Sequence, residues 1–168
     1  MRKYLQDSLA QLSVGGSLLS WHSQDGLLPE GIHDCTLSSA KKYLATNKHR
    51  LELWENLEEV VREMVDWSLT GVLYIAGSFV SDKELPGDLD VTFDMSNESK
   101  RQRLLAMDFL EENHRRIMNE YRIQWYVNNP ARIGASFIDY FQYAGEDVAV
   151  AKRIDIKHKR GILRISSW

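Results

Sequence analysis

Hydrophobic residues recur at steps of three and four along residues 47–69, and charged residues fill most of the positions between them. This spacing is typical of a helix that buries one face against a core. A second helix is expected to begin after Ser96 or Asn97, either of which can cap it, and to run to about residue 120. The expected core positions of the two helices are Leu51, Trp54, Leu57, Val61, Met64, Val65, Leu104, Leu105, Met107, Phe109, Leu110 and Ile117.

Four shorter segments have the patterns of strands. Residues 71–76 form an apolar run rich in β-branched and aromatic side chains, which is typical of a buried strand. Residues 88–94 alternate between apolar and polar side chains, so their two kinds of side chain face opposite sides of a strand. Residues 121–127 and 162–165 predict two further strands. Short helices are expected over residues 36–44, capped by Thr36 or Ser38, and over residues 133–143.

The order of these elements predicts an α+β fold with a mixed β-sheet flanked by helices. The length of 168 residues fits one domain of ordinary size. We interpret residues 1–26 as an N-terminal appendage, because a short amphipathic segment there leads into a glycine pair and a polar turn at residues 23–26. Residues 27–168 then form a single domain.

Composition and charge narrow the setting of the protein. The net charge is −3, so no global field draws the chain to nucleic acid or to an anionic membrane. The single cysteine, Cys35, excludes an internal disulfide and fits a reducing compartment. The sequence has neither a signal-peptide pattern nor a run of about 18 apolar residues. We therefore expect a cytoplasmic protein without a membrane partner.

Several chemical requirements meet in residues 77–91, GSFVSDKELPGDLDV. Gly77 follows a predicted buried strand, where glycine lets backbone amides approach an anion closely, and Ser78 adds a hydroxyl donor. Asp88 and Asp90 are two residues apart on the next strand, so both carboxylates point to one face. Neighbouring carboxylates repel each other unless a cation joins them, and Mg²⁺ bound to substrate phosphates meets that need. The segment predicts a metal–nucleotide site.

This pattern resembles the DNA polymerase beta-like nucleotidyltransferase superfamily, whose signature is Gly-Ser, a loop and then Asp-x-Asp. More narrowly, the chain resembles a family of small bacterial and phage proteins assigned to that superfamily. That family has an LPPG-like turn followed by His, a Gly-Ser-Phe-Val turn with a lysine and Pro-Gly-Asp-x-Asp, and a closing Phe-Gln and Lys-Gly-Ile. The matching segments here are residues 28–33, 77–91, 141–142 and 160–162. A nucleotidyltransferase-like fold is the implied architecture.

The resemblance implies roles for individual residues. Asp88 and Asp90 would be Mg²⁺ ligands. Gly77 and Ser78 would hold the β- and γ-phosphates of a nucleoside triphosphate, with ATP as the expected one. Lys83 would lie near the same phosphates.

The chain departs from the active members of the superfamily at two positions. Their third catalytic carboxylate corresponds here to Gln124, a neutral amide that cannot take a proton and is a poor metal ligand. Their closing lysine corresponds to Arg160, which would bind the nucleotide and which keeps the charge but not the geometry. Asp94 lies roughly 13 Å along the strand from Asp90, too far to replace the missing carboxylate easily. Asp139 is another candidate for that role.

Two functions remain open. One is a Mg²⁺-dependent nucleotidyltransferase that moves a nucleoside monophosphate from a triphosphate to a hydroxyl of a protein, an RNA or a small molecule. The other is a catalytically degenerate binding module in a toxin–antitoxin, phage-defence or counter-defence setting, with a protein partner or a second copy of the chain. RNA is a weaker partner prediction, based on the basic residues 152–160. His33 is expected to hold a backbone carbonyl.

Overall fold

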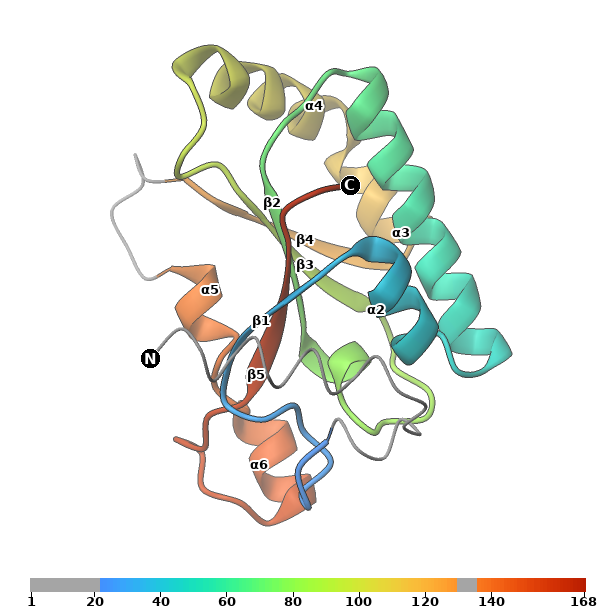
Figure 1. Ribbon diagram of the computed structural model, residues 1–168, viewed down its shortest axis with the longest axis vertical. Helices are drawn as coiled ribbons and strands as arrows, with labels where there is room; N and C mark the ends of the chain where they lie inside the picture. Colours follow the sequence, from blue (N-terminus) through green and yellow to red (C-terminus); the bar gives the residue numbers. More distant parts are fainter. Residues whose placement is uncertain (1–21, 130–135) are drawn as a thin grey trace.

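One five-stranded sheet organises the fold. The computed structural model describes residues 22–129 and 136–168, coloured along the chain in Figure 1. In chain order the elements are β1 (Gly31–Cys35), α2 (Leu37–Leu44), α3 (Lys48–Asp66), β2 (Val72–Ala76), the 3-10 helix η3 (Gly77–Val80), β3 (Leu89–Asp94), α4 (Lys100–Asn119), β4 (Ile123–Asn128), α5 (Phe137–Tyr140), α6 (Glu146–Lys152) and β5 (Gly161–Ile165).

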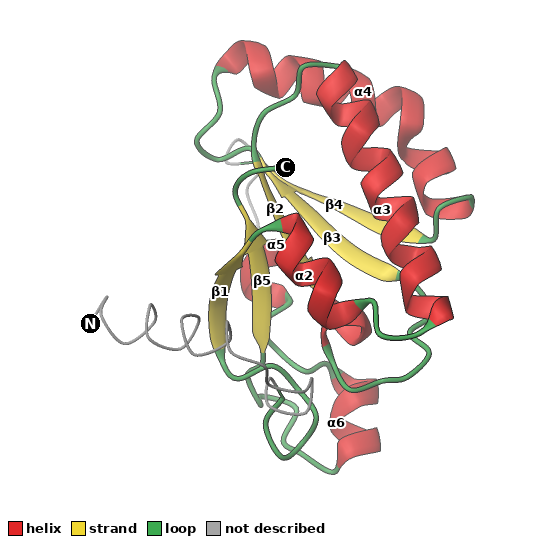
Figure 2. Ribbon diagram, turned by 45° about the vertical axis from the view of Figure 1, so that its right-hand side comes forward, coloured by secondary structure: helices red, strands yellow, loops and turns green. Residues whose placement is uncertain are grey.

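The sheet is mixed, with the strand order β1-β5-β2-β3-β4. The outer pairs β1/β5 and β3/β4 are parallel, whereas β2 runs antiparallel to both of its neighbours. Helices α2, α3 and α4 cover one face of the sheet, and Figure 2 shows them on the same side of the strands. The predicted α+β fold with a mixed sheet flanked by helices is confirmed, and all four predicted strands are present.

Alternation along the strands divides the apolar side chains between the two faces of the sheet. Strand β3 sends Leu89, Val91 and Phe93 into the main core, against the three covering helices. The residues between them point to the opposite face. That face carries a smaller apolar cluster made of Tyr74, Ala76, Phe141 and Ile162. Asp90 and Asp94 of β3 therefore share a face with this second cluster, away from the main core.

Four of the predicted core positions on the helices are wrong. Val65, Leu104 and Met107 are 51%, 57% and 49% exposed, and Leu51 is only half-buried. Helix α4 packs against β4, at the edge of the sheet, so only a narrow stripe of its surface is covered. The buried side chains of α3 and α4 are Arg50, Leu53, Trp54, Leu57, Val60, Val61, Met64, Ala106, Phe109, Leu110 and Ile117.

Some boundaries also differ from the prediction. Thr36 caps α2 as expected, but α4 is capped by Ser99 and not by Ser96 or Asn97. The reason is that the Ser96 hydroxyl donates to the Asp94 carboxylate instead (2.6 Å). Residues 133–135 of the predicted helix 133–143 lie outside the described residues, and the rest forms only the short α5. Strand β1 and helix α6 were not predicted.

The predicted appendage, residues 1–26, falls mostly outside the described residues. Its last part forms the expected turn, in which the amide of Gly26 donates to the carbonyl of Ser23 (2.9 Å). The carbonyl of Gly26 then accepts from the amide of Asp82 (2.9 Å), which ties the turn to the loop after η3. Within the described ranges, no helix combines the length and the apolar character needed to cross a membrane.

A buried arginine joins three parts of the chain that surround this loop. The guanidinium of Arg50, on α3, donates to the carbonyls of Leu44 (2.6 Å), Lys83 (2.7 Å) and Phe79. It also lies 4.5 Å from the centre of the Phe79 ring. Arg50 is 3% exposed, and this burial lowers its pKa to about 10. Helix α3 thereby fixes the backbone of η3 and of the loop that follows.

Replacing Arg50 by methionine is expected to lower the free energy of unfolding by about 2–4 kcal/mol, because buried carbonyls lose their donors. Chemical denaturation measures the change. The matched control is Arg62→Met on the same helix, whose side chain is 68% exposed. Its loss is expected to stay below about 0.5 kcal/mol. Equal losses in the two variants would show that Arg50 does not hold the loop.

Candidate functional site

The candidate site begins where strand β2 ends. Ala76, the last residue of β2, is paired with Asp90 of β3 in the antiparallel ladder. Gly77 follows with a φ of +72°, in the left-handed region that favours glycine. A Cβ atom at Gly77 would lie 1.7 Å from Oδ2 of Asp90. The predicted turn and the predicted carboxylate are therefore in direct contact, with no room for a side chain between them.

The two aspartates interact unfavourably with each other. Burial, and after it the charge of Asp88, raises the pKa of Asp90 to about 6, while Arg160 acts in the opposite direction. A cation that bound both carboxylates would remove this repulsion. Mg²⁺ is bound in proteins by one or two carboxylates together with water and substrate phosphates. The pair Asp88 and Asp90 fits that donor set.

Gln124 lies where the resemblance predicts a third carboxylate. It is the register partner of Asp90 in the parallel pair β3/β4, so the two side chains leave the sheet on the same face. No group of three or more His, Cys, Asp or Glu side chains within residues 22–129 and 136–168 could hold a metal ion. The acidic part of the site consists of Asp88 and Asp90.

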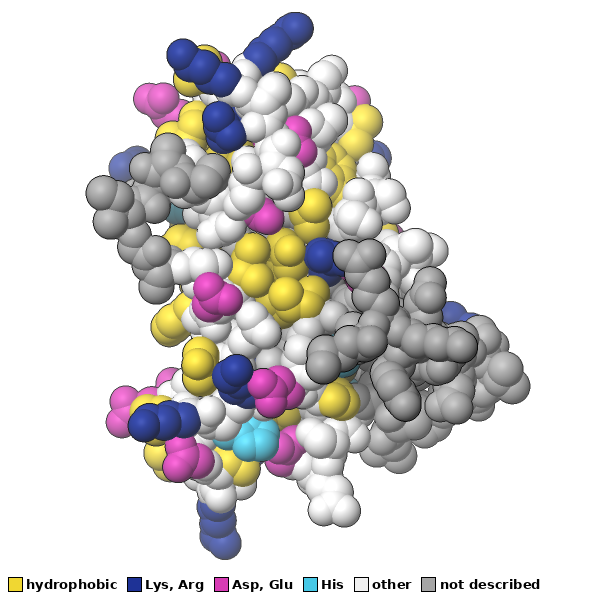
Figure 3. Space-filling model, turned by 60° about the vertical axis from the view of Figure 1, so that its left-hand side comes forward, with side chains coloured by type: hydrophobic (Ala, Val, Ile, Leu, Met, Phe, Trp, Pro, Cys, Tyr) yellow, Lys and Arg dark blue, Asp and Glu magenta, His cyan; other side chains and the backbone are white. Residues whose placement is uncertain are grey.

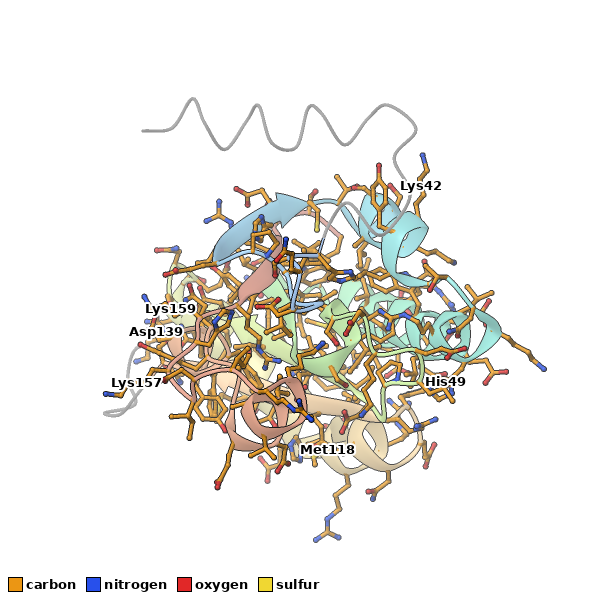
Figure 4. The ribbon with its side chains drawn as sticks, turned by 90° about the horizontal axis from the view of Figure 1, so that it is seen from below. Lys42, His49, Met118, Asp139, Lys157 and Lys159 are labelled. Atoms are coloured by element: carbon orange, nitrogen blue, oxygen red, sulfur yellow. The ribbon has the colours of Figure 1, made fainter. Side chains whose placement is uncertain are left out.

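The two other acidic candidates have different partners. The carboxylate of Asp94 accepts hydrogen bonds from Ser96 and from the side chain of Asn128 (2.8 Å). Asp139 is exposed on α5 and lies at the edge of the molecule with Lys157 and Lys159 (Figure 4). The pKa of Lys159 is raised mainly by its hydrogen bond to Glu30 and also by the charge of Asp139. Within the described residues, neither Asp94 nor Asp139 joins Asp88 and Asp90 in a group of three acidic side chains.

Three of the predicted phosphate-binding side chains line one cleft of about 520 Å³. They are Ser78 at the start of η3, Lys83 in the loop after it, and Arg160 just before β5. The side chain of Lys83 is exposed, whereas Arg160 is only 7% exposed. Nε of Arg160 donates to the carbonyl of Phe141 (3.1 Å), and burial lowers the pKa of its guanidinium against the opposing effect of Asp90. Arg160 thus connects the cleft with the carboxylates.

Helix α6 forms the other wall of this cleft, through Asp147, Val148, Ala151 and Lys152. Nζ of Lys152 lies 2.8 Å from Oδ1 of Asp82, so α6 is tied to the loop after η3. The sequence carries a weak signal for this helix, since Gly145 precedes two acidic residues and a lysine falls in the last turn. Seven residues give too little periodicity to identify it.

Three of the six basic residues in 152–160 form ion pairs with acidic ones. Besides the pair of Lys152 and Asp82, His158 lies 2.9 Å from Asp25 and Lys159 lies 3.2 Å from Glu30. These partners come from the turn at residues 23–31 and from the loop after η3. The segment fastens α6 to the rest of the fold, and this reduces the charge that it offers to RNA.

The flanking motifs of the resemblance meet at the pair β1/β5 and have a structural role. His33 donates from Nε2 to the carbonyl of Pro29 (2.8 Å), as predicted for this histidine. The amide of Gly161 donates to the carbonyl of Leu28 (2.9 Å). A Cβ atom at Gly161 would lie 2.3 Å from the carbonyl oxygen of Pro29, so glycine is required there. This packing fixes the position from which Arg160 enters the cleft.

The raised pKa of Asp90 predicts a stability that depends on pH in the absence of divalent cations. The folded chain binds a proton at Asp90 more readily than the unfolded chain does, so the contribution of Asp90 to stability falls as the pH rises from about 4 to 6. Asp90→Asn removes this loss. The change that it causes in the free energy of unfolding is expected to be about 1–2 kcal/mol more favourable at pH 7.5 than at pH 4.

Denaturant unfolding in EDTA at the two pH values measures this difference. Asp108→Asn, at an exposed position of α4, is the control and is expected to change stability by less than about 0.5 kcal/mol at either pH. An effect of Asp90→Asn that is the same at both pH values would contradict the raised pKa.

Comparison with known proteins relates the whole described fold to one family. The model of a family described as "Family of unknown function (DUF6932)" matches residues 19–166. Searches of curated proteins and of solved structures gave no match. The matched range includes every helix and strand of the structure and all residues of the candidate site. The chain therefore belongs to the DUF6932 family.

Proposed function

We propose that the protein is a Mg²⁺-dependent nucleotidyltransferase that transfers a nucleoside monophosphate from a nucleoside triphosphate, with ATP as the expected donor. The observation that carries the proposal is the contact between Gly77 and the Asp90 carboxylate, with the guanidinium of Arg160 acting on the same carboxylate. A turn that exposes backbone amides beside two carboxylates suits a metal-bound triphosphate.

The side chains of the cleft support the binding of the triphosphate. Ser78 offers a hydroxyl donor, and Lys83 and Arg160 offer positive charge within the same cleft. Asp88 and Asp90 would hold Mg²⁺, which when bound orients the triphosphate and neutralises the charge that develops during transfer. Helix α6 forms the other wall of the same cleft.

The reaction proposed for this arrangement is a substitution at the α-phosphorus. The acceptor hydroxyl oxygen forms a bond to that phosphorus, the bond from phosphorus to the bridging oxygen of the β-phosphate breaks, and pyrophosphate leaves. The hydroxyl proton passes to solvent, because the amide of Gln124 cannot accept it. A protein, an RNA and a small molecule are all open as the source of the hydroxyl.

A second candidate function is supported by Gln124. A neutral amide opposite Asp90 leaves the site with two carboxylates, which is enough to bind a magnesium–nucleotide complex but provides no general base. A nucleotide-binding module that acts on a protein partner or on a second copy of the chain is the function that fits this difference. For either function we propose a cytoplasmic location, in keeping with the single free thiol of Cys35.

Transfer of label from α-³²P-ATP in the presence of Mg²⁺ and a cell extract tests the enzyme. Asp88→Asn is expected to lower the rate at least about 100-fold, because a metal ligand is lost. Asp139→Asn is the control and is expected to leave the rate unchanged. Binding of ATP with a rise in Tm but without any transfer of label would reject the enzyme in favour of the binding module.

The variant Gln124→Glu separates the two functions further. A carboxylate opposite Asp90 completes a three-carboxylate site and is expected to lower the Mg²⁺ concentration needed for half-maximal ATP binding about tenfold. If the wild type is a binding module, this variant is also expected to gain transfer of label. Gln24→Glu, in the exposed turn at residues 23–26, provides the control. An unchanged Mg²⁺ requirement would show that Gln124 does not face the metal position.

A further inference from the structure

Four aromatic side chains form a continuous surface next to the candidate site. The ring of Tyr126, on β4, lies 5.0 Å from Phe137 and 4.9 Å from Phe141, and Tyr140 lies 5.3 Å from Phe141. We call these four residues the aromatic shelf. Figure 3 shows the molecule from the side of α5, where hydrophobic side chains gather in the middle of the face with charged side chains around them.

The shelf lies on the same face of the sheet as the carboxylates. Gln124 is paired with Asp90, and Tyr126, two residues further along β4, is paired with Thr92. Side chains two residues apart on a strand leave the sheet in the same direction, roughly 6.5 Å from each other. The buried edge of the shelf therefore begins one side-chain position away from the proposed metal ligands.

Arg160 links the shelf to the cleft that is lined by Ser78 and Lys83. Its guanidinium lines this cleft and donates from Nε to the carbonyl of Phe141, one of the shelf residues. Tyr140 lies near enough to Arg160 and to Tyr126 to contribute to the pKa of each. A molecule whose phosphates occupy the cleft would have its other end within reach of the shelf.

The outer part of the shelf is open to solvent. Tyr140 is 66% exposed, although its ring rests edge-on against Phe141, which is 6% exposed. A large aromatic ring that stays exposed is a surface on which another flat ring can stack. Stacking on aromatic side chains tolerates any base, because every base has a π-face.

We propose that the aromatic shelf is a binding site for the base of the donor nucleotide, with the exposed ring of Tyr140 as its main stacking surface. This inference rests on the proposed function, since it assigns one end of the same ligand. The base would stack on the shelf while the phosphates occupy the cleft and the metal ion lies between them on Asp88 and Asp90. The shelf would then distinguish a nucleoside triphosphate from a bare polyphosphate.

Calorimetric titration of the full chain with two probes tests the assignment, namely ATP and inorganic tripolyphosphate, each with Mg²⁺. Tyr140→Ala is expected to weaken ATP binding about 5- to 50-fold and to leave tripolyphosphate binding unchanged. Tyr140→Trp is expected to retain ATP binding. The control is Tyr143→Ala, which removes another exposed tyrosine (43%) outside the shelf and is expected to leave both ligands unaffected.

The same titration separates failure of this inference from failure of the proposed function. Asp88→Asn is expected to weaken both ligands. If Asp88→Asn does so while Tyr140→Ala leaves ATP binding unchanged, or weakens both ligands equally, the base does not stack on the shelf and the proposed phosphate site stands. If the wild type binds neither ligand, the proposed function and the shelf assignment are both overturned.

Discussion

The pairing of β2 with β3 is the constraint on which the candidate site depends. It places the end of one strand beside Asp90 on the next, so the chain must turn away in direct contact with a carboxylate. Only glycine fits at that turn, because a Cβ atom at Gly77 would overlap the Asp90 oxygen and because the turn needs a positive φ. The backbone amides of η3 and the acidic residues of β3 are held together by this single register.

Buried arginine side chains surround this turn but do not pair directly with the carboxylates beside it. Arg50 lies beneath η3 and satisfies its donors with carbonyls, while Arg160 lies near enough to Asp90 to lower the pKa of its carboxyl against the effect of burial. Burying two guanidinium groups and a repelling pair of carboxylates costs folding free energy. Such an arrangement of groups is typical of sites that bind a charged ligand, where stability is lost for the sake of binding.

The sequence was sufficient for those parts of the structure that depend on local pattern. Strands β2 to β5, the Gly-Ser turn and the closeness of Asp88 to Asp90 follow from alternation and from turn chemistry, and the structure agrees with them. The burial of Arg50 could not be predicted, since an arginine among other charged residues of an amphipathic helix has no local mark of burial. Its partners lie up to 33 residues away in the chain. The aromatic shelf likewise joins β4 to α5 by tertiary packing alone.

The neutral amide of Gln124 affects how strongly the proposed site would attract a metal ion. A third carboxylate opposite Asp90 would add negative charge to a position where burial and Asp88 already raise the pKa of Asp90 to about 6. The neutral amide avoids this added repulsion, so the free site is easier to fold but attracts a cation less strongly. In the proposed site, with only two carboxylates, Mg²⁺ would take its remaining ligands from water and from the phosphates of the nucleotide. Under that proposal metal and nucleotide binding would be coupled, and each is expected to be weak without the other.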